Sequence, residues 1–392
     1  MNRKINSQNV IFLIIVALFW FAQYVYIPYQ TTYLMAIGTA SSMVGVVVGA
    51  YGISQLILRL PVGLCADRIG RHKPFIMMGA MASGAASVFR VLLCNGYGFM
   101  AANLLSGFAS AMWISFMVYY TGKFKIDEQQ KATSRIVMFN NLGMLLGFIA
   151  STLCYSKLGM KKLCILSVLA GGIAFFLAFL LKEERIKKGT FTVQELLGVC
   201  KGRQLLMFSV IALVQQGIQL TTTMSFTNQI LKDYGASDGI VGISSIIYMV
   251  SAVAFSAMAS SKLCERKGPA FWVPAVLAVI VIYCTFVPIA GSIPWILILQ
   301  VLPGMATGIL FSYATSEAMR EIPEGQKSTA MGFYQAVYAV GMTVFPMFTG
   351  SIVSSKGMQA GYLVLAGIAL IGGITAKVYY ITQKSKTGSG QK

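Results

Sequence analysis

Charged residues are scarce in this 392-residue chain, which has only 12 acidic residues and a single histidine. Charged side chains make up 11% of the sequence, whereas a soluble domain averages about 25%. This shortage argues against a soluble fold. The seven cysteines are scattered without the close pairs that bind zinc, and His72 stands alone in a basic loop, so we expect no metal site and no cofactor.

Long hydrophobic runs are abundant instead. Hydrophobic residues make up 56% of the chain, and one membrane span needs roughly 20 mostly apolar residues. Twelve spans are predicted, at 10–36, 42–66, 74–95, 97–121, 132–156, 161–181, 204–231, 239–261, 269–290, 294–318, 329–353 and 357–381. Lipid cannot satisfy backbone polar groups, and continuous apolar runs exclude the alternation of a barrel. The predicted fold class is an all-α integral membrane protein.

The net charge of +19 is unevenly distributed. With residue 1 in the cytoplasm, all but six of the 31 Lys and Arg residues fall on the cytoplasmic side, the exceptions being Arg90, Lys157, Lys161, Lys162, Lys232 and Lys356. This bias predicts a multi-pass protein of the cell membrane with both termini in the cytoplasm. The excess charge suits anionic lipid headgroups. We therefore expect the lipid bilayer and a small molecule as partners, no nucleic acid, and a monomer.

The chain divides into two similar parts. A polar linker at 182–203 separates six spans in 1–181 from six in 204–392. The stretch "EQQKAT" (128–133) matches "EGQKST" (324–329), and "GLCADRIG" (63–70) aligns with "SKLCERKG" (261–268). Two matches in the same order, at nearly the same separation and at equivalent span ends, indicate a duplicated six-helix unit.

This duplicated bundle resembles the major facilitator superfamily over the whole chain. The most specific element is the loop signature between spans two and three, carried by Gly63, Asp67, Arg68, Gly70, Arg71 and Lys73. The resemblance implies a secondary transporter whose two six-helix bundles give alternating access to a central site. We expect the signature, together with Glu265 and Arg266 of the second copy, to control the change of conformation.

Asp67 is the acid in this basic loop. In the family fold the inner end of span two lies beside span eleven, which begins near Ser328 and Thr329. A helix N-terminus stabilises a carboxylate by roughly 0.3–2 kcal/mol. Asp67 is therefore predicted to act as a latch that favours the outward-facing state. A topology anchor that happens to contain an acid is the alternative.

Polar side chains form stripes on two spans. Span one carries Gln23, Tyr26, Gln30 and Tyr33 on one helical face, and the equivalent face of span seven carries Gln219, Thr222, Phe226 and Gln229, extended by Gln215. Glutamines facing lipid would be costly. We favour cavity lining, and interhelical hydrogen bonding without a ligand is the alternative. Further candidates at similar depth are Asn103, Trp113, Asn140, Asn141, Tyr334, Gln335 and Tyr338, although ordinary packing explains the tyrosines equally well.

Charge within the spans constrains the solute. No acid lies in mid-span, and Glu317, at the inner end of span ten, comes closest. A proton site or a cation site normally uses a buried acid, so proton coupling and cationic solutes are disfavoured. Arg59, near the cytoplasmic end, is able to snorkel, and we interpret it as a structural anchor. Arg90 either snorkels near the outer end of span three or faces the cavity and attracts an anion.

The sequence thus predicts a transporter of a small organic solute that is neutral or anionic. Multidrug efflux within the same superfamily is the alternative, because aromatic-lined cavities permit it. A non-transporting receptor or scaffold is a more remote alternative. No combination of residues typical of a catalytic site is present, so we expect no enzymatic activity.

Overall fold

The computed structural model describes residues 7–39, 41–183 and 192–389. Among them, eleven helices are long enough and apolar enough to cross a membrane. The longest, α7 (Gln129–Phe179), contains two of the predicted spans, because the chain turns within it at Gly159, where φ is 69°. A left-handed φ favours glycine, which has no Cβ. The predicted twelve-helix fold is therefore confirmed, with a kink where a loop was expected between spans five and six.

Two compact units make up the chain. The first consists of Met1–Ala132, Ile136–Leu205 and Met319–Ala336, and the second of Thr133–Arg135, Leu206–Ala318 and Val337–Lys392. The stretch Met319–Ala336 groups with the first unit because its residues bond to the second span, as described below.

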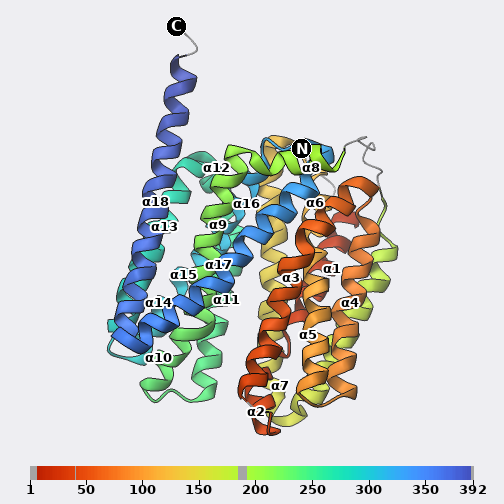
Figure 1. Ribbon diagram of the computed structural model, residues 1–392, viewed down its shortest axis with the longest axis vertical. Coiled ribbons are helices and arrows are strands. Elements are labelled where there is room, and N and C mark those ends of the chain that lie inside the picture. Colours follow the sequence, from red (N-terminus) through yellow and green to blue (C-terminus); the bar gives the residue numbers. More distant parts are fainter. Residues whose placement is uncertain (1–6, 40, 184–191, 390–392) are drawn as a thin grey trace. The chain divides into compact units, whose positions relative to one another are not determined.

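The first unit is a helical bundle with a short linker (Figure 1). Its elements are α1 (Ser7–Tyr24), α2 (Ile27–Ala36), α3 (Ser41–Ile69), α4 (Lys73–Leu92), α5 (Gly96–Ala111), α6 (Trp113–Thr121), η1 (Ile126–Glu128), α7, α8 (Val193–Gly198), η2 (Val199–Lys201) and the start of α17 (Lys327–Lys356).

The second unit is also a helical bundle (Figure 1). Its elements are α9 (Arg203–Thr221), η3 (Thr222–Phe226), α10 (Thr227–Asp233), α11 (Asp238–Ala259), α12 (Lys262–Lys267), α13 (Pro269–Phe286), η4 (Val287–Ile289), α14 (Ile293–Leu299), α15 (Val301–Met305), η5 (Ala306–Leu310), α16 (Phe311–Met319), the remainder of α17 and α18 (Met358–Ser389). The 3₁₀ turn η6 (Glu324–Gln326) precedes α17.

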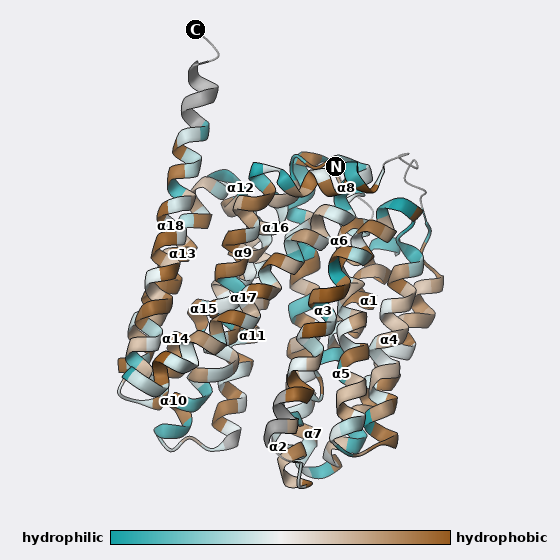
Figure 2. Ribbon diagram, viewed as in Figure 1, coloured by the Kyte–Doolittle hydropathy of each residue, from teal (hydrophilic) through white to brown (hydrophobic). Residues whose placement is uncertain are grey.

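Large apolar side chains cover much of the outer surface of each bundle. Leu92, Phe176 and Ile371 are each about two-thirds exposed or more, at 73%, 71% and 66%. Hydrophobic residues occupy most of the helix middles, and polar residues gather at helix ends and connections (Figure 2). A soluble protein rarely exposes apolar patches of this kind. The surface therefore matches a chain that is embedded in lipid.

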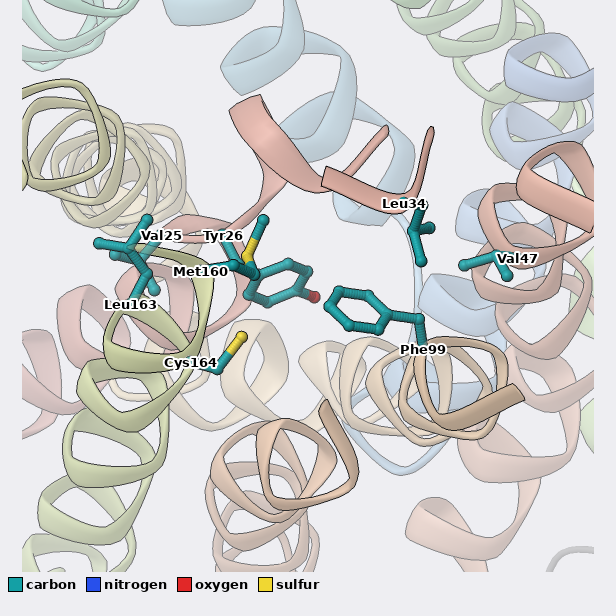
Figure 3. Close-up of a cluster of buried hydrophobic side chains, with 8 residues drawn as sticks. All are labelled: Val25, Tyr26, Leu34, Val47, Phe99, Met160, Leu163 and Cys164. Carbon is teal, nitrogen blue, oxygen red and sulfur yellow. The ribbon is translucent and has the colours of Figure 1, made fainter. Parts of the chain in front are cut away.

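The first unit contains a buried apolar cluster around the rings of Tyr26 and Phe99 (Figure 3). Its other members are Val25, Leu34, Val47, Met160, Leu163 and Cys164. These residues come from four different spans, so the cluster fixes the mutual positions of helices that are distant in sequence. Tyr26 also has a polar partner in the bundle, which is described in the next section.

The internal repeat seen in the sequence extends to the backbone. Gly70 and Gly268 occupy the same place in the two aligned motifs, with φ of 65° and 67°. Each donates its N–H to the carbonyl four residues earlier, at 2.9 Å. The matching stretches at 128–133 and 324–329 likewise each begin at a 3₁₀ turn, η1 or η6. These likenesses support duplication of one six-helix unit.

Candidate functional site

In the described part of the chain, spans one, four, seven and ten are interrupted at matching positions of the two repeats, and span ten breaks a second time at Gln300. Span one breaks between α1 and α2, and span seven becomes a π-helix at η3. Span four breaks at Met112, and span ten becomes a π-helix at η5. The alignment of 128–133 with 324–329 places Tyr26 opposite Thr222 and Met112 opposite Gly308. Interrupted helices at corresponding positions of two repeats point to a substrate site in transporter folds.

Local chemistry explains the interruptions in spans one and seven. Pro28 lies in the first turn of α2 and cannot donate a backbone hydrogen bond to the preceding turn. In span seven three successive threonines turn their hydroxyls onto carbonyls four residues earlier, and Thr222 bonds to Ile218 O at 2.8 Å. Such bonds bend helices. The three successive threonines could therefore have indicated a distorted helix here. The prediction of a polar face on span seven did not take them into account.

Arg90 is the centre of a buried polar cluster in the first unit. Its side chain is 1% exposed, so it does not snorkel. Its Nη2 donates to Tyr26 Oη at 2.8 Å, to Asn103 Oδ1 at 2.7 Å and to Ser106 Oγ at 3.0 Å, and Nη1 donates to Ser87 Oγ at 2.9 Å. The guanidinium also lies 3.7 Å from the centroid of the Tyr26 ring. The cluster joins spans one, three and four.

The hydrogen-bond partners of Arg90 are all neutral. A guanidinium has five donors, and its Nε has no acceptor in the part of the chain that the structure describes. No described carboxylate pairs with it either. A buried charge without a counter-charge is costly, and in a membrane bundle it indicates function.

Gln23 extends this cluster by one turn. Its Nε2 donates to Ser106 O at 3.0 Å and to Ser110 Oγ at 3.2 Å, but its Oε1 is buried without a donor in the described chain. Gln30, which is 4% exposed, also leaves its Oε1 unsatisfied. The interhelical hydrogen bonding that the sequence left as an alternative is thus observed at Gln23, whereas cavity lining by this stripe stays a prediction.

The second unit contains a related set of amides. Gln215 Nε2 donates to Gln219 Oε1 at 3.0 Å, and Gln219 in turn donates to the hydroxyl of Tyr248. Tyr248 shares a 2.8 Å hydrogen bond with Thr307 in the π-helix of span ten. The Oε1 of Gln215, which is 1% exposed, has no donor in the described chain. The interrupted spans seven and ten are therefore connected through polar side chains.

The polar stripe of span seven does not continue as predicted. Gln229 is exposed and donates to Asp233 Oδ1 at 2.7 Å, so it is not part of a buried face. The π-helix η3 inserts a wider turn between Gln219 and Gln229 and rotates everything that follows. The sequence argument assumed a regular helical period throughout. Thr222 is buried, but its hydroxyl is engaged by its own helix.

The remaining candidates have other neighbours. Trp113 is 4% exposed and packs among aromatic rings, with centroid distances of 5.2 Å to Trp20 and 5.6 Å to Phe116. Asn141 is buried and accepts from Asn140 at 3.2 Å. Tyr334 and Tyr338 are buried, and the Tyr338 ring packs edge-on against Phe311. Packing accounts for Trp113 and Tyr338.

Asp67 has the neighbours that the family resemblance implied. One carboxylate oxygen accepts from the backbone N–H of Ser328 at 3.0 Å, and the other accepts from the N–H and hydroxyl of Thr329 at 2.6 and 2.7 Å. These are free donors of the first turn of α17. The contact itself is confirmed, whereas its role in gating stays a prediction.

Two glycines allow α3 and α17 to approach so closely. A Cβ on Gly63 would overlap Ser328 O, and a Cβ on Gly332 would lie 2.7 Å from Arg59 O. Arg59 is 4% exposed, so it does not snorkel; it donates to Gln335 O at 2.6 Å and to Gln55 Oε1, as a structural anchor does. The close approach of α17 supplies a carbonyl partner, so the guanidinium has no need to reach water.

The other signature residues hold the end of span six. Arg71 Nε lies 4.0 Å from Glu183 Oε2, the Lys73 N–H donates to Glu183 Oε1 at 3.3 Å, and Lys73 Nζ donates to Phe179 O at 2.8 Å. Arg68 is exposed. Glu265 and Arg266 are exposed on α12, a separate short helix capped by Ser261, whereas Asp67 and Arg68 are on the unbroken α3.

Sequence reasoning did not select several residues of these networks. They are Ser87, Ser106, Ser110, Tyr248 and Thr307. Ser106 and Ser110 are one turn apart on α5, a spacing that places them on one face. That pattern was available in the sequence, but serine is common in membrane helices. Only the position of Arg90 distinguishes these serines from others.

Comparison with known proteins agrees with this architecture. The family model of the Major Facilitator Superfamily matches residues 12–282 and 208–392. A curated relative, the inner membrane transport protein YajR of Escherichia coli (strain K12), is 26% identical over 369 residues, which cover 90% of this chain and 77% of that protein.

Solved structures share the fold. The human organic anion transporter MFSD10 (TETRAN) superposes with a TM-score of 0.80 at 15% identity, covering 95% of this chain and 100% of the other. The Escherichia coli fucose:proton symporter FucP gives a TM-score of 0.75 at 13% identity, covering 95% and 99%. The family match over the whole membrane region, together with the twelve-helix fold, identifies the chain as a multi-pass membrane transporter of the Major Facilitator Superfamily.

Proposed function

We propose that this transporter moves a small organic solute, neutral or anionic, by alternating access. The proposal includes six-helix halves at 1–181 and 204–392, joined by the linker 182–203, and both termini in the cytoplasm. The choice of solute rests on one observation: Arg90 is buried and is bonded only to neutral oxygen atoms.

Arg90 makes solute binding depend on the charge of the solute, because it lies in surroundings of low dielectric constant. Charges act more strongly on each other inside a protein than in water. A cation close to Arg90 would be repelled, and no mid-span carboxylate is available to compensate. An anion would supply the counter-charge that the cluster lacks. A neutral solute would be bound by hydrogen bonds alone.

Unsatisfied amide oxygens favour a solute that can donate hydrogen bonds. The Oε1 atoms of Gln23, Gln30 and Gln215 are buried without a donor in the described chain. Buried polar atoms normally have a partner, so each of these requires water or a bound molecule. Gln23 and Gln30 belong to the same unit as Arg90, and these three residues fit a solute that has an acidic or polar end and several hydroxyl or amide hydrogens.

The contacts of Asp67 support a latch. Its three hydrogen bonds depend on the start of α17 lying against α3. A conformation that separates these helices would leave the carboxylate without its helix N-terminus. We propose that the contact stabilises the state in which the cytoplasmic side is closed, and that Gly63 is required for it.

A matched series of ligands tests the choice of solute. The purified protein is titrated with sets of three compounds that share one body and differ in carrying a carboxylate, a carboxamide or an amine. We expect the carboxylate or carboxamide member of a binding set to bind, and the amine to bind far more weakly. Binding of a carboxylate should decrease in Arg90→Gln, whereas binding of a carboxamide should not.

Substitutions of the buried glutamines test the location of the solute site. Gln23→Ala and Gln219→Ala should each weaken binding by about 1–3 kcal/mol, because a polar contact of the solute is lost. Ile14→Ala and Val210→Ala, at exposed positions on the same two spans, are the matched controls and should bind as the wild type does. An amine that binds best, and binds equally well to both glutamine variants, would contradict the site and the solute class together.

A further inference from the structure

Helices α13 and α18 lie side by side in the second unit (Figure 1), and a groove runs along their shared surface. Its volume is about 400 Å³. Small residues, Ala275 and Ala278 on α13 and Ala369 and Gly373 on α18, line it. The larger lining residues Leu370 and Ile374 remain exposed on the α18 side. Small side chains between larger ones leave a continuous apolar groove.

The dimensions of the groove match one leaflet of a bilayer. Its lining residues on α13 extend from Ala270 to Val281, which is about 16 Å of helix. Half of the hydrocarbon thickness of a bilayer is about 15 Å. The groove begins one residue after the start of α13, so it occupies the leaflet in which that helix begins. It is therefore placed to receive an acyl chain.

Positive charge is concentrated at the end where α13 begins. Lys377 is the charged residue among those that line the groove. Lys267 joins it from α12, because its Nζ lies 4.3 Å from the ring centroid of Phe271, another lining residue. No acidic residue of the described chain lines the groove. An apolar groove that ends at two lysines is complementary to a molecule with an apolar tail and an anionic head.

We infer that this groove binds one anionic phospholipid, with an acyl chain along the small residues and its phosphate at Lys377 and Lys267. A soluble anion would leave the apolar walls unused. A second copy of the chain in a symmetric contact would bring like charges together at the lysines. A phospholipid satisfies both the walls and the charge. The inference does not depend on which solute is transported.

Native mass spectrometry of the purified full-length protein tests this site. Phosphatidylglycerol and phosphatidylethanolamine with identical acyl chains are titrated separately. We expect one phosphatidylglycerol to bind more tightly than phosphatidylethanolamine. Lys377→Gln should lower the affinity for phosphatidylglycerol about fivefold, since a lysine near anionic lipid contributes about 1 kcal/mol, and should leave phosphatidylethanolamine unaffected.

A second variant tests the apolar groove rather than the charge of the lysines. Ala278 is exposed in the groove, so Ala278→Phe should fill the groove without disturbing the bundle and should reduce the binding of both lipids. The controls are Lys356→Gln, an exposed lysine at the end of α17, and Ile282→Phe, an exposed position of α13 outside the groove. Equal affinity of the wild type for the two lipids, or unchanged binding in Lys377→Gln or Ala278→Phe, would overturn the inference.

Discussion

Arg90 and Asp67 are charged residues in a largely uncharged bundle, and their surroundings differ in kind. Arg90 is surrounded by neutral oxygen atoms from three spans, which orient the guanidinium but leave its charge uncompensated. Asp67 faces the backbone donors at the start of α17, which compensate a negative charge. The first arrangement suits a residue that meets a solute, and the second suits a residue that makes and breaks a structural contact.

At Asp67 the substitution Asp67→Asn tests the latch. An amide cannot accept from all three donors as a carboxylate does, and it has no charge to interact with the helix N-terminus. We expect the contact with α17 to weaken by about 2 kcal/mol, roughly a 30-fold change in population. Ser328 is fully buried, so Ser328→Cys serves as the reporter, in a chain from which the exposed Cys65 and Cys94 have been removed.

Thiol-reactive labelling of this reporter should be faster in Asp67→Asn than with Asp67 present. The conservative Asp67→Glu serves as a control that retains the negative charge. Labelling rates that are identical with and without the Asp67→Asn substitution, accompanied by normal transport, would leave Asp67 as a topology anchor only.

His72 links stability to pH. It lies outside the spans, between α3 and α4, where burial lowers the pKa of its imidazole to about 4. Its Nδ1 lies 3.4 Å from Ser115 Oγ, and its Nε2 has no partner in the described chain. The unfolded chain, with a histidine pKa of about 6.5, binds more protons between these two values. The stability that the neutral ring contributes is therefore present above about pH 7 and is lost as the pH falls toward 4.

Thermal or denaturant unfolding at pH 7.5 and pH 5 measures this effect. The wild type should lose about 2 kcal/mol more than His72→Asn over this interval. Other groups titrate in both proteins, so the difference between them isolates His72. Parallel pH dependence in the two proteins would show that the imidazole is not kept neutral.

At the scale of elements, glycine determines how closely two helices pack. A Cβ on Gly332 of α17 would lie 2.7 Å from the carbonyl oxygen of Arg59, whereas a Cβ on Gly52 of α3 would meet nothing within 4 Å. The two positions form a matched pair for the same substitution. One lies in the contact between α3 and α17, and the other does not.

Gly332→Ala should lower the free energy of unfolding by about 1–3 kcal/mol, because backbone must move to admit the methyl group. Gly52→Ala should be neutral or stabilising, because alanine favours the helix by up to about 1 kcal/mol. Equilibrium unfolding in mild detergent compares the two. The contact would not be tight if both substitutions had the same effect.

For the whole molecule, the absence of acids from the middle of the membrane limits the coupling mechanism. Glu317, the acid nearest to mid-span, lies two residues before the end of α16. A proton-coupled carrier needs a group that titrates within the membrane. Solute uptake into sealed vesicles should therefore change by less than about twofold when a pH gradient is imposed. Strong stimulation that is abolished by Glu317→Gln would place a proton site at that end of span ten.

Much of the fold was predictable because its determinants are local. A run of about 20 apolar residues must form a helix in lipid, whatever its neighbours are. Hydrophobicity and positive charge therefore indicated the spans, and the two repeated motifs indicated duplication. The contact of Asp67 was predicted in a different way, from the resemblance to a family fold in which the inner end of span two lies beside the start of span eleven.

The partners of the buried polar groups were decided only by tertiary structure. Arg90 and Arg59 have similar apolar surroundings in the sequence, yet one bonds to side chains of three spans and the other to a carbonyl of α17. Gln229 was lost from its stripe because a π-helix shifted the register. A buried donor takes whatever acceptor packing brings within about 3 Å, and that choice depends on helices far away in the sequence. The sequence by itself determined where the chain crosses the membrane, and the packing of those crossings determined which side chains meet.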